Sequence, residues 1–221
     1  MAFLVVLLAA VVVAAPAGAG GAVRPLPPCR DRAYNLSSSK WIGPMRWWFR
    51  ASSTPKGVPR SSAQAALRRA ASNIASGRNN CGLPDHISAT QRFIGRTSRA
   101  TDVTDSGTCG PPDGRSVVGF GSLPSGFLAL TCWWIRDGHT VEADIKLNKA
   151  TFRWVPVARR GCVLNWSIEA VATHEFGHAF GLAHVYGTVN DRLTMDPLIA
   201  PCQNSQATLG LGDVRGLQAK Y

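Results

Sequence analysis

The sequence predicts a single α+β domain, in which a sheet of several strands packs against helices. Three observations lead to this prediction: runs rich in Val, Phe, Leu, Trp and Ile between Gly-containing turns, a segment with small apolar residues at helical spacing, and a second helical segment that carries three histidines. At 221 residues the chain is long enough for one full core and too short for a second large domain.

The N-terminal 19 residues are predicted to be a signal peptide. An unbroken apolar run covers residues 2–15, and the small residues Ala17, Gly18 and Ala19 follow it. The alternative, an uncleaved membrane anchor, would need about 20 apolar residues before the first interruption. We therefore expect a secreted, extracellular protein without stable membrane insertion. Residues 20–39 read as an extended segment, and residues 40–221 as the folded domain.

The elements of the domain follow in order. Residues 40–50 are aromatic and predict the first strand. Four apolar residues at helical spacing then predict an amphipathic helix that begins after Ser61 or Ser62 and ends at Gly77. These residues are Ala63, Leu67, Ala70 and Ile74. Residues 85–112 are polar and predict a loop with at most a short strand, whereas 116–120, 127–135 and 140–148 predict sheet strands.

The stretch from His174 to His184 fits the zinc-protease pattern HExxHxxGxxH. On a helix, His174 and His178 lie one turn apart on one face and can bind the same ion. Glu175 then lies beside the open metal position and can act as general base. Gly181 can adopt a positive φ and turn the chain back, so that His184 approaches as the third ligand. Asn165 or Ser167 is expected to cap this helix, with Glu169 in its first turn.

A second signal follows eleven residues after His184, where Met195 lies in a tight polar turn. The chain resembles the matrixins in these residues, in Ala143-Asp144-Ile145 and in the closing segment 211–221. The matrixins are the matrix metalloproteinase catalytic domains of the metzincin clan, and the resemblance is to a secreted, bacterial-type member. The resemblance implies a zincin fold with a mixed, mostly parallel twisted sheet, one antiparallel edge strand, an active-site helix and a C-terminal helix. It also implies one catalytic zinc on the three histidines, Glu175 as base and Met195 as the Met-turn.

The resemblance further implies a substrate cleft. The strand 141–148 alternates apolar and polar residues, which predicts one buried face. We expect it to be the edge strand of the cleft and to pair with an extended peptide through its backbone, with Ala143, Asp144 and Ile145 in contact with substrate. Pro197 and Leu198, after the Met-turn, are expected to form the outer wall of the pocket for the residue that follows the scissile bond.

Six cysteines in a chain expected to be secreted predict three disulfides. Sequence alone allows fifteen pairings. We expect Cys162–Cys202 around the active-site helix and Cys109–Cys132 across a hairpin, which leaves Cys29–Cys81. The segment Cys81-Gly82-Leu83-Pro84-Asp85 also matches the core of the matrixin cysteine switch, in which a thiolate caps the zinc. Its position after the first strand and helix favours the disulfide.

The chain carries 24 Lys and Arg against 13 Asp and Glu, a net charge of +11. The basic residues are scattered and form no recognisable nucleic-acid fold, so a solvated basic surface is favoured over a dedicated polyanion site. Attraction to an anionic surface or polymer is nevertheless expected. The loop 85–112 lacks the alternating acidic pattern of a calcium loop, so calcium binding stays open.

We thus expect a secreted, monomeric zinc endopeptidase that acts on polypeptides. Two other functions compete with it. One is a metzincin-like protein that binds a protein or surface polymer without cleaving it, and the other is a zinc amidase that acts on a cell-wall cross-link.

Overall fold

The computed structural model describes residues 4–11, 27–187 and 192–221. A seven-stranded sheet forms its centre, with the order β1-β7-β8-β6-β4-β5 and with β3 beside β8. Only β7 runs against the other strands of this sheet. The strands are β1 (Leu4–Val11), β3 (Lys40–Trp41), β4 (Met45–Phe49), β5 (Gln91–Arg96), β6 (Ser116–Gly121), β7 (Phe127–Arg136) and β8 (His139–Asn148). The predicted α+β class with a mostly parallel sheet is confirmed.

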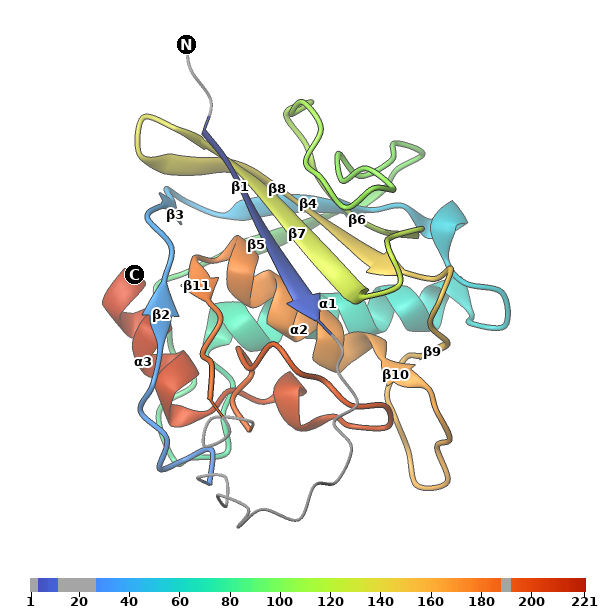
Figure 1. Ribbon diagram of the computed structural model, residues 1–221. Helices are drawn as coiled ribbons and strands as arrows, with labels where there is room; N and C mark the ends of the chain where they lie inside the picture. Colours follow the sequence, from blue (N-terminus) through green and yellow to red (C-terminus); the bar gives the residue numbers. More distant parts are fainter. Residues whose placement is uncertain (1–3, 12–26, 188–191) are drawn as a thin grey trace.

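Two helices, α1 (Arg60–Ser76) and α2 (Ile168–Ala179), lie together on one side of the sheet, and α3 (Leu211–Lys220) closes the chain (Figure 1). No helix among the described residues is long and apolar enough to cross a membrane. The remaining short elements are β2 (Asn35–Leu36) with β11 (Leu182–Ala183), β9 (Trp154–Val155) with β10 (Trp166–Ser167), and the 3-10 turns η1 (Ala51–Ser53) and η2 (Ser205–Ala207).

Small residues on α1 bring it close to α2. Ala63, Ala66 and Ala70 are fully buried, together with Leu67. Alanine favours the helix and adds little bulk, so the two helix backbones can approach each other. The helix ends at Gly77, whose φ of +67° is left-handed, as predicted. The core between these helices and the sheet fixes the position of α2, which carries His174 and His178.

The expectation that residues 141–148 form an edge strand is wrong. β8 lies inside the sheet: β7 pairs with it on one side, and on the other side β3 pairs with residues 139–140 and β6 with residues 145–148. Its polar face is also buried, because residues 97–115, which we call the covering segment, fold over it. Asp144 accepts hydrogen bonds from the backbone N–H groups of Asp102 and Val117. Glu142 accepts them from Asp113 and Gly114 of the covering segment. Ala143, Asp144 and Ile145 have no exposed surface and therefore cannot contact a substrate.

The three expected disulfides, Cys29–Cys81, Cys109–Cys132 and Cys162–Cys202, are present. Cys81 is therefore not a free thiol, and all six cysteines are paired. The alternative of a cysteine switch does not hold in this structure. The predicted signal peptide is not tested by the fold: residues 4–11 form β1, and the small residues at 17–19 lie outside the described part of the chain.

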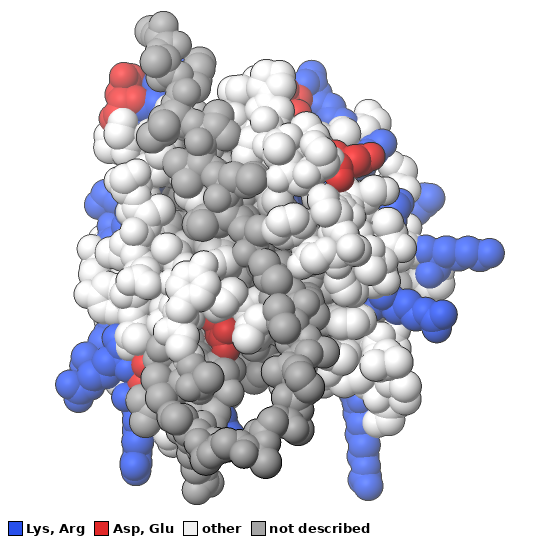
Figure 2. Space-filling view, viewed as in Figure 1, with Lys and Arg blue, Asp and Glu red and all other residues white. Residues whose placement is uncertain are grey.

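Among the charged side chains on the surface, basic ones are more frequent than acidic ones. In Figure 2, Lys and Arg project around the margin of the molecule and few acidic residues appear among them. They are spread out rather than gathered into one patch on this face, in agreement with the scattered pattern of the sequence.

Four carboxyl groups gather on the face of the sheet that points away from α1 and α2. Oxygens of Asp102, Asp113 and Glu142 lie within 4.8 Å of one another, and Asp144 is adjacent through its bond to the Asp102 backbone. Burial, with a smaller contribution from Asp102, raises the pKa of Glu142 from 4.5 to about 7, and burial also raises the pKa of Asp144. Arg99 pairs with Asp113 at 2.5 Å. Calcium binding, which the sequence left open, can be tested at this cluster.

This cluster predicts a pH effect on stability. The folded chain holds a proton on Glu142 that the unfolded chain has already lost, so the contribution of Glu142 to the free energy of unfolding is fully present below pH 4.5 and is lost as the pH rises through about 7. Glu142→Gln should remove this loss. Urea unfolding of wild type and variant at pH 5, 6, 7 and 8 measures the difference between their slopes.

Asp105→Asn is the matched control, because Asp105 is exposed and its hydrogen bond to Lys146 lowers its pKa. It should leave the slope between pH 5 and 7 unchanged. The explanation fails if Glu142→Gln retains the wild-type slope.

Candidate metal centre

The N-terminal end of α2 is fixed by two polar contacts. The Ser167 hydroxyl accepts a hydrogen bond from Ala170 N at 3.3 Å, so Ser167 is the N-cap. Glu169 lies in the first turn, where a carboxylate complements the helix dipole, and it accepts a bond from Arg69 Nε of α1 at 2.6 Å. All twelve residues of the helix are buried. The helix is therefore a rigid support for the side chains in its second half.

The three predicted ligands converge. The Nε2 atom of His174 lies 3.1 Å from Nε2 of His178 and 3.1 Å from Nε2 of His184, and the last two are 3.0 Å apart. Ligand nitrogens of a tetrahedral zinc site, with Zn–N bonds of about 2.0–2.1 Å, lie about 3.3 Å apart. The triangle is thus within a few tenths of an ångström of the size that the ion requires.

The outer nitrogens decide which atoms face the centre of this triangle. Nδ1 of His174 lies 2.7 Å from the carbonyl oxygen of Thr194, and Nδ1 of His178 lies 3.0 Å from that of Leu182. A carbonyl only accepts, so both Nδ1 atoms carry the proton and both Nε2 atoms present lone pairs. Lone pairs at 3 Å repel one another unless a cation lies between them. The chemistry of this donor set therefore fits a metal ion.

Burial keeps these imidazoles neutral. It lowers the pKa of His174 to about 3, with a further contribution from nearby His184, and it lowers the pKa of His184 to about 4. The pKa of His178 is lowered well below its usual range, again mainly by burial. Neutral imidazole is the form that binds metal, so the ligands need not lose a proton at neutral pH.

Gly181 allows His184 to reach the other two ligands. Its φ is +90°, and a Cβ atom at this position would lie 2.9 Å from the Ser39 carbonyl oxygen. The chain then continues into β11, which pairs with β2, and Asn35 Nδ2 donates to the carbonyl oxygen of His184 at 2.8 Å. The Tyr186 hydroxyl lies 3.2 Å from Nδ1 of His184. The predicted turn and third ligand are therefore brought together with the first two.

The turn at Met195 lies against α2, as the Met-turn prediction requires. A Cβ atom on Gly177 would lie only 2.4 Å from Met195 Sδ, so the thioether fills the space left by that glycine. Asp213 of α3 holds the turn in place by accepting bonds from the backbone N–H groups of Thr194 and Met195. Burial raises the pKa of Asp213 to about 6, against the opposing effect of these donors.

The comparison with known protein families agrees with this geometry. Residues 124–221 match the model of the matrixin family, Peptidase_M10, a range that includes β7, β8, the histidine helix and α3. The C-terminal part of the chain, from β7 onward, is thus similar to the matrixins. A search of curated proteins finds no match. The family match and the His174–His178–His184 triad together point to zinc metallopeptidase chemistry in general.

The candidate base of this matrixin-like centre is fully buried beside the ligands. Glu175 accepts a hydrogen bond at Oε2 from the Thr131 hydroxyl of β7 at 2.6 Å, whereas Oε1 has no hydrogen-bond partner among the described residues. Burial raises the pKa of Glu175 to about 8, and the Thr131 hydroxyl opposes this shift. One carboxylate oxygen is therefore held by the sheet and the other remains available for proton transfer.

Thr131 and Asp213 were not identified from the sequence. Thr131 is one polar residue in an apolar strand, where a threonine is common. Asp213 resembles an ordinary first-turn acid of a helix, and only the fold shows that it reaches back to the Met-turn. Of the two residues expected in the pocket wall, Leu198 is 43% exposed and Pro197 is half-buried, so their contact with substrate stays a prediction.

Removal of the Thr131 hydroxyl should reduce turnover. Thr131→Val keeps the shape of the side chain but releases Glu175 Oε2, so we expect kcat to fall about 10- to 100-fold with little change in KM or zinc content. Thr131→Ser retains the hydroxyl and should stay near wild type. Equal rates for the Val and Ser variants would show that this bond does not position the base.

Proposed function

We propose that this chain is a secreted zinc endopeptidase in which Glu175 is the general base. The observation that carries the proposal is the pairing of three converging Nε2 atoms with a buried carboxyl group, one oxygen of which has no hydrogen-bond partner among the described residues. A structural zinc site needs four protein ligands, whereas three histidines leave one position open. The Cys162–Cys202, Cys29–Cys81 and Cys109–Cys132 disulfides favour an extracellular location.

The zinc, when bound, supplies Lewis-acid activation of water and of the scissile carbonyl. The chain supplies the proton transfers. Glu175 Oε1 accepts the proton from the attacking water and then passes it to the leaving amine, while the Thr131 hydroxyl keeps the carboxylate oriented through Oε2. Thr194 and Leu182 fix the rings of His174 and His178 through their carbonyl oxygens, so the ligands do not rotate during turnover.

The position of β7 suggests how an extended substrate is held. β7 is the one antiparallel strand of the large sheet, and its residue Thr131 donates a hydrogen bond to Glu175, so a chain that pairs with the edge of β7 opposite β8 would pass beside Glu175. In the structure this edge is paired with residues 4–11, from Leu4 opposite Ile135 to Val11 opposite Phe127. We propose that a peptide substrate takes the place of β1 once the predicted signal peptide is removed.

This arrangement predicts a difference between the two forms of the chain. The intact chain carries an internal competitor for the β7 edge, and a tethered segment reaches an effective concentration of about millimolar. A chain that begins at residue 20 should therefore cleave an unfolded protein with a kcat/KM at least ~10-fold higher than the intact chain. Both forms should hold the same amount of zinc.

Leu7→Pro in the intact chain is the matched variant. It places a proline, which disfavours a regular strand, opposite Cys132 and should restore part of the activity without shortening the chain. If the intact and shortened chains cleave equally well, β1 does not occupy the substrate position.

The role of Glu175 can be tested independently. Glu175→Gln should retain zinc, because Glu175 is not a ligand, and should lose at least ~100-fold in kcat because the amide cannot accept the proton. The measurement is cleavage of an unfolded protein and of a mixed peptide library, together with zinc content.

If neither wild type nor variant cleaves although both hold zinc, the endopeptidase proposal is wrong. A non-catalytic binder or an amidase specific for a cell-wall cross-link would then fit the site better.

A further inference from the structure

A cavity of about 420 Å³ lies away from the metal centre, on the face of the sheet opposite α1 and α2. It opens beyond the carboxyl ends of three neighbouring parallel strands, at Arg50 after β4, at Gly121 in β6 and at Lys146 in β8. We call it the outer-face cavity. It shares no lining residue with the histidine site, and residues 100–105 of the covering segment form its rim.

Cations dominate the outer-face cavity. Arg50, Lys146 and Lys149 line it, and Asp105 is the one acidic residue among the described lining residues. Asp105 pairs with Lys146 at 2.8 Å, but its side chain is 76% exposed whereas that of Lys146 is 9% exposed. The carboxylate is thus exposed, whereas most of the lysine side chain is buried. Because Asp105 pairs with Lys146, it is Arg50 and Lys149 that leave the lining with an excess of positive charge.

Arg50 lines the outer-face cavity, and its buried Nε has no hydrogen-bond partner among the described residues. A buried, unsatisfied donor on a charged group is costly, and a nearby negative charge would offset part of this cost. Lys149 Nζ donates to the Ser53 carbonyl oxygen at 2.8 Å, which holds its ammonium group at the edge of the same cavity.

Two glycines of β6 make room for these cations. A Cβ atom on Gly119 would lie 3.2 Å from the Ser53 hydroxyl and 3.4 Å from Cβ of Arg50. A Cβ atom on Gly121 would lie 3.0 Å from Cδ of Lys146. Glycine in a strand interior weakens the strand, and it commonly marks a place where another group approaches closely. Both glycines lie on the same face of β6, two residues apart, so the side chains of Arg50 and Lys146 can lie directly over the strand.

We propose that the outer-face cavity binds a tetrahedral oxyanion, phosphate or sulfate, through Arg50, Lys146 and Lys149. Such an anion offers several acceptor oxygens at once and would balance the excess positive charge of the lining side chains. Hydroxyl groups of Ser52, Thr101 and Ser122 stand around the same cavity and can add neutral hydrogen bonds. The site is independent of the peptidase proposal because it shares no residue with the metal centre.

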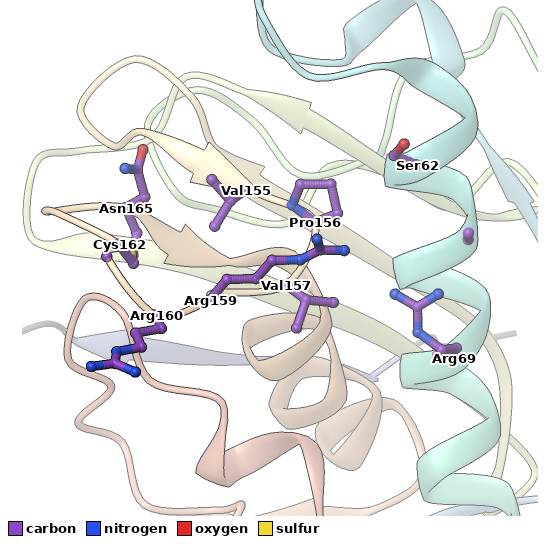
Figure 3. A pocket seen from close by; sticks show the side chains of 11 residues that line it. Ser62, Arg69, Val155, Pro156, Val157, Arg159, Arg160, Cys162 and Asn165 are labelled. Atoms are coloured by element: carbon purple, nitrogen blue, oxygen red, sulfur yellow. The ribbon is translucent and has the colours of Figure 1, made fainter.

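A second basic cavity, of about 530 Å³, provides the competing location. It lies between α1 and residues 155–165, and Figure 3 shows Arg69 and Arg159 reaching into it from opposite sides. Arg69 is already paired with Glu169. Arg159 lines this other cavity and none of the outer-face cavity, so it is a suitable control for the binding experiment.

The test is calorimetric titration of the disulfide-bonded, zinc-loaded chain with inorganic phosphate, and separately with sulfate, at constant ionic strength. Wild type should bind saturably with one additional site. Arg50→Gln should weaken this binding at least about tenfold, and Lys149→Gln should weaken it several-fold. Asp105→Asn should strengthen it, because the one carboxylate at the rim is removed. Arg159→Gln, with the same loss of charge in the other cavity, should bind like wild type.

Thermal unfolding of each variant separates a folding defect from a binding defect, and Lys149→Gln alters an exposed side chain if Arg50→Gln fails to fold. The proposal is overturned if wild type shows no saturable binding, if Arg50→Gln and Lys149→Gln both bind like wild type, or if Arg159→Gln is the variant that loses binding. None of these outcomes depends on peptide cleavage, so the proposed peptidase activity stands or falls separately.

Discussion

The convergence of three buried imidazoles on one point is the constraint on which the centre of this molecule depends. His174 and His178 turn unprotonated Nε2 atoms toward this point because backbone carbonyls occupy their Nδ1 atoms, and Asn35 anchors the backbone of His184 beside them. Two lone pairs at this distance repel each other, so a bound cation adds to stability. The buried helix α2, the tight turn at Gly181 and the turn at Met195 hold the three rings in place.

The sheet that supports the metal centre also carries buried ionisable groups on its other face, and there protons neutralise part of the charge. Asp144 and Glu142 are buried among backbone N–H donors and keep raised pKa values, so protons neutralise part of their charge. Further along β8, the buried side chain of Lys146 lines a cavity in which positive side chains outnumber negative ones. β8 thus runs from a cluster of carboxyl groups to a cavity lined by three cations and one carboxylate.

The sequence was most informative where chemistry depends on short spacing. The grouping of the three histidines, the Ser167 cap option and the Cys162–Cys202 disulfide could be predicted because neighbouring residues on a helix, or cysteines that flank it, have few alternatives. The position of β8 could not be predicted, because Glu142, Asp144 and Lys146 are typical of the solvent-exposed face of an edge strand. In the fold, residues 97–115 cover this face. Thr131 contacts Glu175, 44 residues away in the sequence, and Asp213 contacts Met195, 18 residues away. No local sequence pattern indicates such contacts.

The contact between Gly177 and Met195 has a consequence for how related chains can vary. Because a Cβ atom at 177 would overlap the thioether of 195, the two positions share a single volume across the helix and the turn. A chain that gains a methyl group at the first position must lose bulk at the second, or else displace the turn whose carbonyl orients His174. Substitutions at these two sites are therefore expected to occur as pairs, and a family alignment should show them changing together.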